Sequence, residues 1–396
     1  MKKLMIVRSQ TALAGLALMV SAVSGSAAVL HVPADYPTIQ GAVDAAASGD
    51  EIRIAAGTYT EQVVIASKNL KLIGESGAVL EAGPGLAATL TPYGEPNVQP
   101  LVAIALCDDV TVCGLTLNGK QLGPVYPGLV GVAFHGSSGR MEHCLVRGFR
   151  LATGIGGVGF GSENRPYLGR PPQQLQVLGN HFEDNQNAIG IAADGALQND
   201  VRLRFIIQGN TIAGFGPTDT ETQIGIFARD GTTGEISDNT ITGHNYTGGG
   251  LNFSLGIAIS SHGLPVRYTR NVFRNNQVGL FTQFGQGSQF VNNTFEGPGF
   301  GIVSTDSGDQ MVNNRFTDSS LGIGLFGDDP DFGTALGIAR DATLIANRFC
   351  HVAVPILIEP LVTGTREHGN QLNACQPTPH DGHDLGRNGR GDQHQD

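Results

Sequence analysis

Residues 271–325 repeat one pattern three times, and this repeat constrains the fold more than any other feature of the sequence. In each copy an Asn is followed two positions later by a Phe, and a Gly then opens a short apolar stretch. The Asn residues are 22 and 21 positions apart. A fixed period of this size is typical of solenoids, in which similar units stack along one axis. The repeated residues are Asn271, Asn293 and Asn314, then Phe273, Phe295 and Phe316, then Gly279, Gly301 and Gly322.

About 21 residues can form one turn of a coil with three short strands and three corners. Stacking such turns at roughly 4.8 Å pairs every strand in parallel sheets. Asn suits one corner, because it tolerates left-handed backbone and its amide can bond to the Asn above and below. The pattern predicts an all-β fold and resembles the right-handed parallel β-helix of pectate lyases, polygalacturonases and pectinesterases.

The segment 32–83 supports this resemblance, because it is similar to the N-terminal stretch of pectinesterases and other exported β-helix proteins. Its apolar residues at 39, 42, 43 and 46 share one helical face, so we expect a short helix that covers the open end of the coil. Strands are expected at Glu51–Ala55, Gln62–Ile65 and Leu70–Ile73. This resemblance concerns a capping module and implies fold rather than chemistry.

The chain is expected to divide into three parts. Residues 1–28 have a basic start, an apolar run and small residues for cleavage, which predicts a signal peptide. Residues 29–375 form the β-helix domain, and residues 376–396 read as a disordered tail. No other stretch is long enough to span a bilayer. The sequence therefore predicts a protein that is secreted or periplasmic.

Charge and composition narrow the possible partners. Removing the signal leaves 24 − 3 = 21 basic residues against 35 acidic ones, a net charge of −14. Nucleic acid is excluded as a partner, because phosphate neutralisation needs a dense basic face. A polysaccharide is the expected partner, and a polyanionic one would need a divalent cation or a local Arg cluster. The chain has no Trp, the favoured surface for stacking sugars. We expect a monomer.

Five cysteines remain in a chain expected to be exported. Cys113 and Cys144 lie near corresponding corners of successive turns and could form a disulfide. Cys350 and Cys375 could tie down the C-terminal end. The odd number leaves at least one thiol unpaired, and the spacings match no zinc motif, so no residue is assigned to a metal.

The candidate site follows from alternation along one strand of each turn. The first residue after each opening Gly points inward, so the second and the fourth residues after that Gly point outward. Long insertions at 159–173, 213–223 and 243–254 are expected to flank this face, and long loops on a rigid scaffold often carry function. The outward residues four positions after each Gly are Asp194, Arg229, Ser260, Gln283, Thr305 and Phe326, with Asp230, His262 and Asp306 just beyond.

Two carboxylates can cleave a glycosidic bond as acid and base when they lie about 5–9 Å apart. We expect Asp194 and Asp230 to meet this distance and His262 to tune them. Polygalacturonases have a loosely similar order of Asp positions, then His-Gly, then a basic residue, and the residues here in that order are Asp194, Asp230, His262-Gly263 and Arg267. The Asn-x-Asp and Asp-Asp motifs of that family are absent. The expected substrate-binding residues are Arg229, Arg165, Tyr167, Arg170, Arg267, Gln283 and Asp306.

Two functional hypotheses follow. The first is an exported polysaccharide-active enzyme, either a glycoside hydrolase or a lyase that would use Arg229 and a bound cation. It requires no cofactor, and calcium is an optional ion suggested by the incomplete calcium-loop pattern at 328–333. The second is a non-catalytic envelope or surface β-helix protein that binds glycan or protein. The absence of Trp and of the family motifs favours the second, and the fold-level resemblance favours the first.

Overall fold

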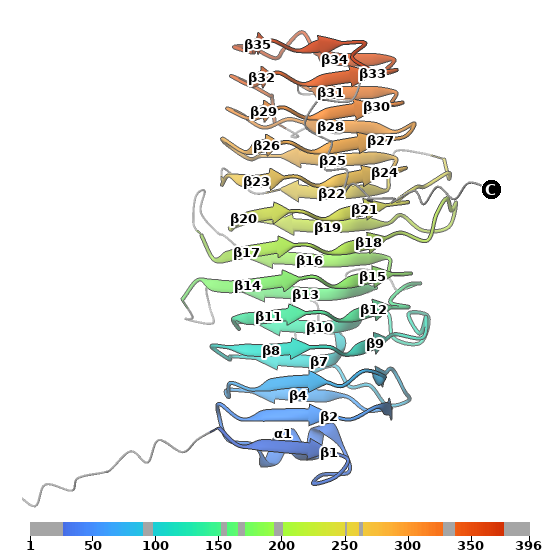
Figure 1. Cartoon of the computed structure of the whole chain (residues 1–396), viewed down its shortest axis with the longest axis vertical. Coiled ribbons are helices and arrows are strands. Elements are labelled where there is room, and N and C mark those ends of the chain that lie inside the picture. The colour runs from blue at the N-terminus through green and yellow to red at the C-terminus, as the bar shows by residue number, and fades with distance from the viewer. Residues whose placement is uncertain are drawn as a thin grey trace, which may run out of the picture.

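The computed structural model describes residues 27–89, 98–151, 157–164, 171–193, 201–249, 252–260, 264–327 and 337–375. Within these residues the chain winds into a coil with three parallel sheets along its length (Figure 1). We call these sheets A, B and C, and each turn of the coil adds one strand to each of them in that order. The segments predicted to be a signal peptide and a disordered tail lie outside the described residues, apart from 27 and 28.

Sheet A has 13 strands. They are β1 (Val29–Val32), β2 (Glu51–Ile54), β5 (Lys71–Gly74), β8 (Val110–Cys113), β11 (Gly139–Glu142), β14 (Gln173–Leu178), β17 (Leu203–Gln208), β20 (Thr232–Ser237), β23 (Val266–Thr269), β26 (Gln289–Val291), β29 (Gln310–Val312), β32 (Thr343–Ile345) and β35 (Arg366–His368).

Sheet B has 12 strands, most of them three residues long. They are β3 (Gly57–Tyr59), β6 (Ala78–Glu81), β9 (Thr116–Asn118), β12 (Leu145–Arg147), β15 (His181–Glu183), β18 (Thr211–Ala213), β21 (Thr240–Thr242), β24 (Val272–Arg274), β27 (Thr294–Glu296), β30 (Arg315–Thr317), β33 (Arg348–Cys350) and β36 (Gln371–Leu372).

Sheet C has 11 strands. They are β4 (Val63–Ala66), β7 (Gln99–Ala105), β10 (Leu129–His135), β13 (Val158–Asn164), β16 (Asn187–Ala193), β19 (Ile224–Arg229), β22 (Leu255–Ser260), β25 (Val278–Gln283), β28 (Phe300–Ser304), β31 (Leu321–Leu325) and β34 (Val354–Ile358).

A helix closes the N-terminal end of the coil, as the sequence predicts. Helix α1 (Ile39–Ala45) packs against β1, β2 and β4 and buries Ile39, Ala42 and Val43. Its first backbone N–H groups are satisfied, because the Thr38 hydroxyl accepts from Gly41 and the Glu61 carboxylate accepts from residues 39 and 40. The predicted strands are confirmed to within one residue at each end as β2, β4 and β5. Strand β1 was not predicted.

A ladder of buried asparagines runs along the corner between sheets A and B, and this confirms the predicted alignment of the repeats. Each side-chain carbonyl accepts the backbone N–H and the amide N–H of the preceding ladder residue at 2.8–3.1 Å. The members are Asn180, Asn210, Asn239, Asn271, Asn293, Asn314, Asn347 and Asn370.

One detail of the predicted corner is wrong. The left-handed backbone belongs to the residue before each ladder Asn, such as Arg270 (φ 54°), and not to the Asn itself. In the earlier turn the ladder position is taken by Cys144, whose N–H donates to the Asn180 carbonyl at 2.9 Å. The ladder therefore selects Asn for its amide rather than for its backbone preference.

The interior is a set of apolar columns. Phe273, Phe295, Phe316 and Phe349 stack with ring centroids 4.6, 4.9 and 5.0 Å apart. The repeated glycines are small because these rings lie against them. A Cβ on Gly301 would lie 2.5 Å from the Phe316 ring and 2.5 Å from the backbone oxygen of the next repeated Gly.

The cysteines divide as one disulfide and three thiols. Cys350 is bonded to Cys375, which ties the chain to the last turn of the coil. The other predicted pair, Cys113–Cys144, does not form. Cys107, Cys113 and Cys144 are free thiols. Burial raises the pKa of the Cys144 thiol to about 12, so this thiol remains protonated and serves as a core residue.

Candidate functional site

The outward face of sheet C carries the candidate site, and strict alternation places its side chains. On β19, Ile226 and Ala228 are fully buried in the coil, whereas Phe227 and Arg229 face outward. The outward face of the earlier strands β7, β10 and β13 is buried in a separate apolar cluster, against which Phe227 packs. The aromatic part of the accessible face therefore begins at Phe227.

The strand register corrects the predicted position of Asp194. Arg229 pairs with Ala192 on β16, and Gly190 pairs with Phe227. The small residue that opens β16 is Ala188 rather than Gly190, so the predicted alignment was displaced by two residues. Gly190 is small for a different reason, because a Cβ there would lie 2.5 Å from the Phe227 ring. Ala192 therefore takes the place in the column that was predicted for Asp194, which is outside the described residues.

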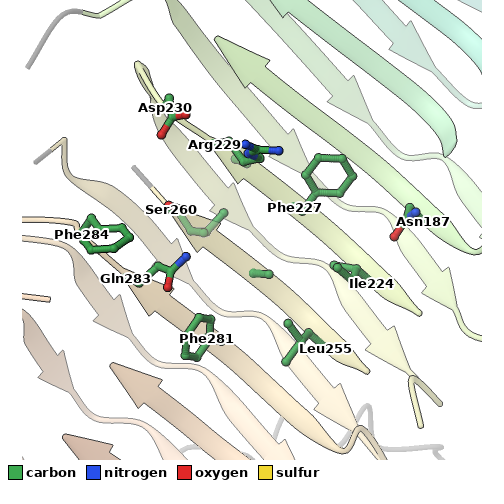
Figure 2. Close-up of a pocket in the computed structure, with 13 residues that line it drawn as sticks. Asn187, Ile224, Phe227, Arg229, Asp230, Leu255, Ser260, Phe281, Gln283 and Phe284 are labelled. Atoms are coloured by element: carbon green, nitrogen blue, oxygen red, sulfur yellow. The ribbon is translucent and has the colours of Figure 1, made fainter. Parts of the chain in front are cut away.

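An open groove of about 610 Å³ runs over β16, β19, β22 and β25. Figure 2 shows its labelled side chains on this face, with Phe227 and Phe281 on either side of β22. The lining residues are Asn187, Ile224, Phe227, Ala228, Arg229, Asp230, Leu255, Ala258, Ile259, Ser260, Phe281, Gln283 and Phe284. Three of the predicted site residues are among them, Arg229, Asp230 and Gln283, together with Ser260 of the predicted outward column.

Sequence reasoning missed the aromatic residues of the groove. Phe227 and Phe281 pair with opposite sides of Ala258, so they lie two strands apart on one face. The signal was present in the sequence, because both phenylalanines are the second residue after an opening Gly and alternation makes this position outward. The prediction used only the next outward position along each strand.

Polar side chains gather where these strands end. Arg229, Ser260 and Gln283 are register partners on β19, β22 and β25. Arg229 is exposed and Asp230, the next residue, is half-buried. The Asp230 backbone N–H donates to the Ser260 carbonyl at 2.9 Å, so the ladder continues to this residue and fixes its place. The groove thus has a charged edge at one end of its strands.

The predicted binding residue Asp306 does not reach the groove. It is 2% exposed, and its carboxylate accepts the Gly285 N–H at 2.7 Å. Asp309 is fully buried nearby and accepts from the Ser304 hydroxyl at 2.9 Å. Burial raises the pKa of Asp306 to about 6, and burial together with the Asp306 charge raises the pKa of Asp309 well above its usual range. The chain turns inward after β28, which breaks the assumed alternation.

Arg267 also lies away from the groove. It is on β23 of sheet A, where its register partners are Glu235 and Gln289. The order of residues shared with polygalacturonases therefore does not bring Arg267 and Asp230 onto one sheet. Four more predicted site residues and the calcium-loop fragment have no described position. The site residues are His262, Arg165, Tyr167 and Arg170, and the calcium-loop fragment is 328–333.

The insertions border the groove at the start of its strands. Residues 213–223 precede β19 and residues 243–254 precede β22, and an isolated parallel bridge between Thr218 and Tyr246 joins the two loops. The Gln223 amide donates to the backbone oxygens of Gly216 and Asn245. The third predicted insertion is partly wrong, because residues 159–164 belong to β13.

Comparison with known proteins agrees with the architecture. Residues 131–321 match the family described as right handed beta helix region. This match covers a little under half of the 396 residues of the chain and agrees with the right-handed parallel β-helix fold of the three sheets. No curated protein sequence matches this chain. Among the described residues, no helix is both long and apolar enough to cross a bilayer.

Several solved β-helix structures are similar to this right-handed β-helix at low identity. The periplasmic alginate epimerase AlgG and the Yersinia enterocolitica family 28 exopolygalacturonase each have 12% identity and a TM-score of 0.46. The match to the epimerase covers 82% of this chain and 77% of the epimerase. The match to the exopolygalacturonase covers 87% of this chain and 78% of that enzyme. Geobacillus virus E2 ORF18 has 12% identity and a TM-score of 0.36, and the chain spans 60% of its length. None of these similarities bears on the activity of this chain.

Proposed function

We propose that this protein binds a polysaccharide along the sheet C groove. The observation that carries the proposal is the pair Phe227 and Phe281, half-buried on an outward sheet face and separated by the small Ala258. Rings two strands apart are roughly 10 Å apart along the coil axis. Aromatic side chains in an open polar-edged cleft offer flat apolar surfaces to sugar rings. In this proposal Phe227 and Phe281 supply the stacking surface that Trp often provides in other sugar-binding sites.

The charged edge supplies the groups that orient a sugar. Arg229 can donate to hydroxyl or carboxylate oxygens, and Ser260 and Gln283 can exchange hydrogen bonds with hydroxyls. The Gln283 Oε1 atom is buried and has no hydrogen-bond partner among the described residues. Export through the segment 1–28, a secreted or periplasmic location and a monomeric state are parts of this proposal. Calcium is an optional ion in it.

Retention on a panel of polysaccharides tests the proposal. The wild-type protein is expected to bind at least one insoluble or immobilised polysaccharide, with Phe227→Ala and Phe281→Ala each weakening binding about tenfold. Ile206→Ala is the matched control, because Ile206 is an exposed apolar residue on sheet A. No retention on any polysaccharide, or equal retention of the Phe227→Ala/Phe281→Ala double variant, would contradict the proposal.

Cleavage of the bound chain is the second candidate function. The observation that favours it is Asp230, a half-buried carboxylate next to the exposed Arg229 at the edge of the groove. In a hydrolase a second carboxylate would complete the acid–base pair. Asp230→Asn should then stop the release of reducing ends or unsaturated products while retention is unchanged, and Glu235→Gln on sheet A should alter neither. No product from any polysaccharide leaves binding as the function.

A further inference from the structure

We infer that the sugars bound in this groove carry methyl-bearing substituents, either O-acetyl groups or the methyl of a 6-deoxy sugar. The inference rests on the proposed function and specifies the class of polysaccharide. It depends on how the lining of the groove is sorted along the strands, and on which polar atoms the protein has already used.

The groove is sorted into three rows across its width. Ile224 and Leu255 are register partners at the start of β19 and β22, and both are half-buried. The aromatic row of Phe227, Ala258 and Phe281 follows, and the polar row lies at the strand ends. Figure 2 shows Ile224 and Leu255 on the side of the strand starts and Arg229 on the opposite side. Over β19 and β22 one edge is thus apolar and the other is polar, whereas the register partner of Ile224 on β16 is Asn187.

The width of the groove exceeds that of an unbranched sugar chain. Ile224 and Arg229 are five positions apart on one strand, which corresponds to roughly 16 Å. A chain that runs along the coil axis over Phe227 and Phe281 has its hydroxyls near the polar row. It reaches the apolar row only through a substituent. The residue order along β19 therefore sets both the position and the polarity of that substituent.

The apolar edge offers few hydrogen bonds to a hydroxyl group. Of the described polar residues beside it, Gln223 and Ser254 are engaged within the protein, because the Gln223 side-chain amide bonds to two loop carbonyls and the Gln223 backbone N–H donates to the Ser254 hydroxyl. The Ser254 N–H donates in turn to the Gln277 side chain. Asn187 on β16 also lines the groove, so the edge is apolar only over β19 and β22. A sugar hydroxyl placed over Leu255 would lose water without gaining a partner among the described residues, whereas a methyl group would gain from burial. The edge therefore selects for methyl over hydroxyl.

Matched sugar pairs test the inference. L-Fucose and L-galactose differ only by the 6-hydroxyl, as do L-rhamnose and L-mannose. O-Acetylated xylan and glucomannan can each be compared with the same polymer after alkaline deacetylation. We expect the methyl-bearing member of a pair to bind about fourfold more tightly per methyl group, by calorimetry or by competition against a retained polysaccharide.

Variants separate this inference from the proposed function. Leu255→Ser should remove the preference for the methyl-bearing member while retention on polysaccharide persists, and Leu357→Ser on β34, an exposed residue of the same sheet outside the groove, should not. Equal or weaker binding of the methyl-bearing members, or no binding of any pair, overturns the inference. The proposed function is overturned by different results, namely no retention on any polysaccharide or equal retention of the Phe227→Ala/Phe281→Ala double variant.

Discussion

The Asn293 side chain forms four hydrogen bonds inside the coil. Its carbonyl accepts the Asn271 backbone and amide N–H groups, and its amide donates to the Tyr268 carbonyl and to Asn314, all at 3.0 Å. Each ladder amide therefore joins three successive turns. The residue is 1% exposed, so no water replaces these bonds if the amide is removed.

Asn293→Ala is expected to lower the free energy of unfolding by about 3 kcal/mol, because it leaves buried backbone and amide groups without partners. Denaturant unfolding followed by circular dichroism measures the change. Gln310→Ala, at an exposed position on β29, is the control and should change stability by less than about 0.5 kcal/mol. Equal effects of the two substitutions would show that the ladder does not stabilise the coil.

The buried carboxyls Asp306 and Asp309 make stability depend on pH. Their pKa values are raised by burial above those of the unfolded chain, to about 6 for Asp306. A group with a raised folded pKa contributes its full stability below its unfolded pKa of about 4 and loses it as pH rises through the folded pKa. The contribution of this pair should therefore fall as pH rises through about 6.

Asp309→Asn tests this dependence. The Asn carbonyl can still accept the Ser288 N–H, and its amide can donate to the Ser304 hydroxyl, so the hydrogen bonds of the carboxyl are preserved. We expect the variant to be more stable than wild type at pH 8 and no more stable at pH 5, in paired denaturant titrations. A gain in stability of the same size at both pH values would mean that ionisation of the buried Asp309 carboxyl does not destabilise the fold.

At the scale of the elements, the repeated Gly on a strand of sheet C packs against the repeated Phe on a strand of sheet B. The large ring therefore requires a residue without a side chain opposite it. Gly301→Ala should cost about 2 kcal/mol, because its Cβ would overlap the Phe316 ring and a backbone oxygen. Phe316→Leu in the same chain should recover part of the loss, and the double-mutant cycle measures that coupling. Gly249→Ala is the control, since a Cβ there would meet nothing within 4 Å. Additive effects of the first two substitutions would contradict the paired packing.

Sequence patterns predicted the elements better than they predicted their register. The repeat of Asn, Phe and Gly placed the turns of the coil, because each residue type has one role in every turn. The Gly of β16 misled the alignment, since Gly190 makes room for Phe227 on the outside rather than for a core ring. A single sequence does not distinguish these two reasons for a Gly. The displaced position of Asp194 follows from this error.

The groove is a property of several turns together and is therefore harder to predict from sequence. Phe227 and Phe281 are 54 positions apart in the sequence (281 − 227) and meet on one face only because β22 lies between their strands. The burial of Asp306 likewise depends on how the chain turns after β28. Residues such as Arg229 and Gln283 were predicted because they occupy equivalent positions of the repeat.

The whole coil presents this groove as a fixed surface, with α1 closing one end and the Cys350–Cys375 disulfide holding the chain to the other (Figure 1). Neighbouring turns are held by continuous parallel ladders through all three sheets, so the spacing of Phe227 and Phe281 is set by the fold and not by a mobile loop. A ligand is expected to bind without rearrangement of the coil.

A crystal structure with an oligosaccharide from the retained polysaccharide tests the central claim most directly. The account predicts sugar rings over β19, β22 and β25, with one ring against Phe227, another against Phe281, and polar contacts to Arg229. An oligosaccharide bound on sheet A or sheet B, with the sheet C groove left open, would contradict it.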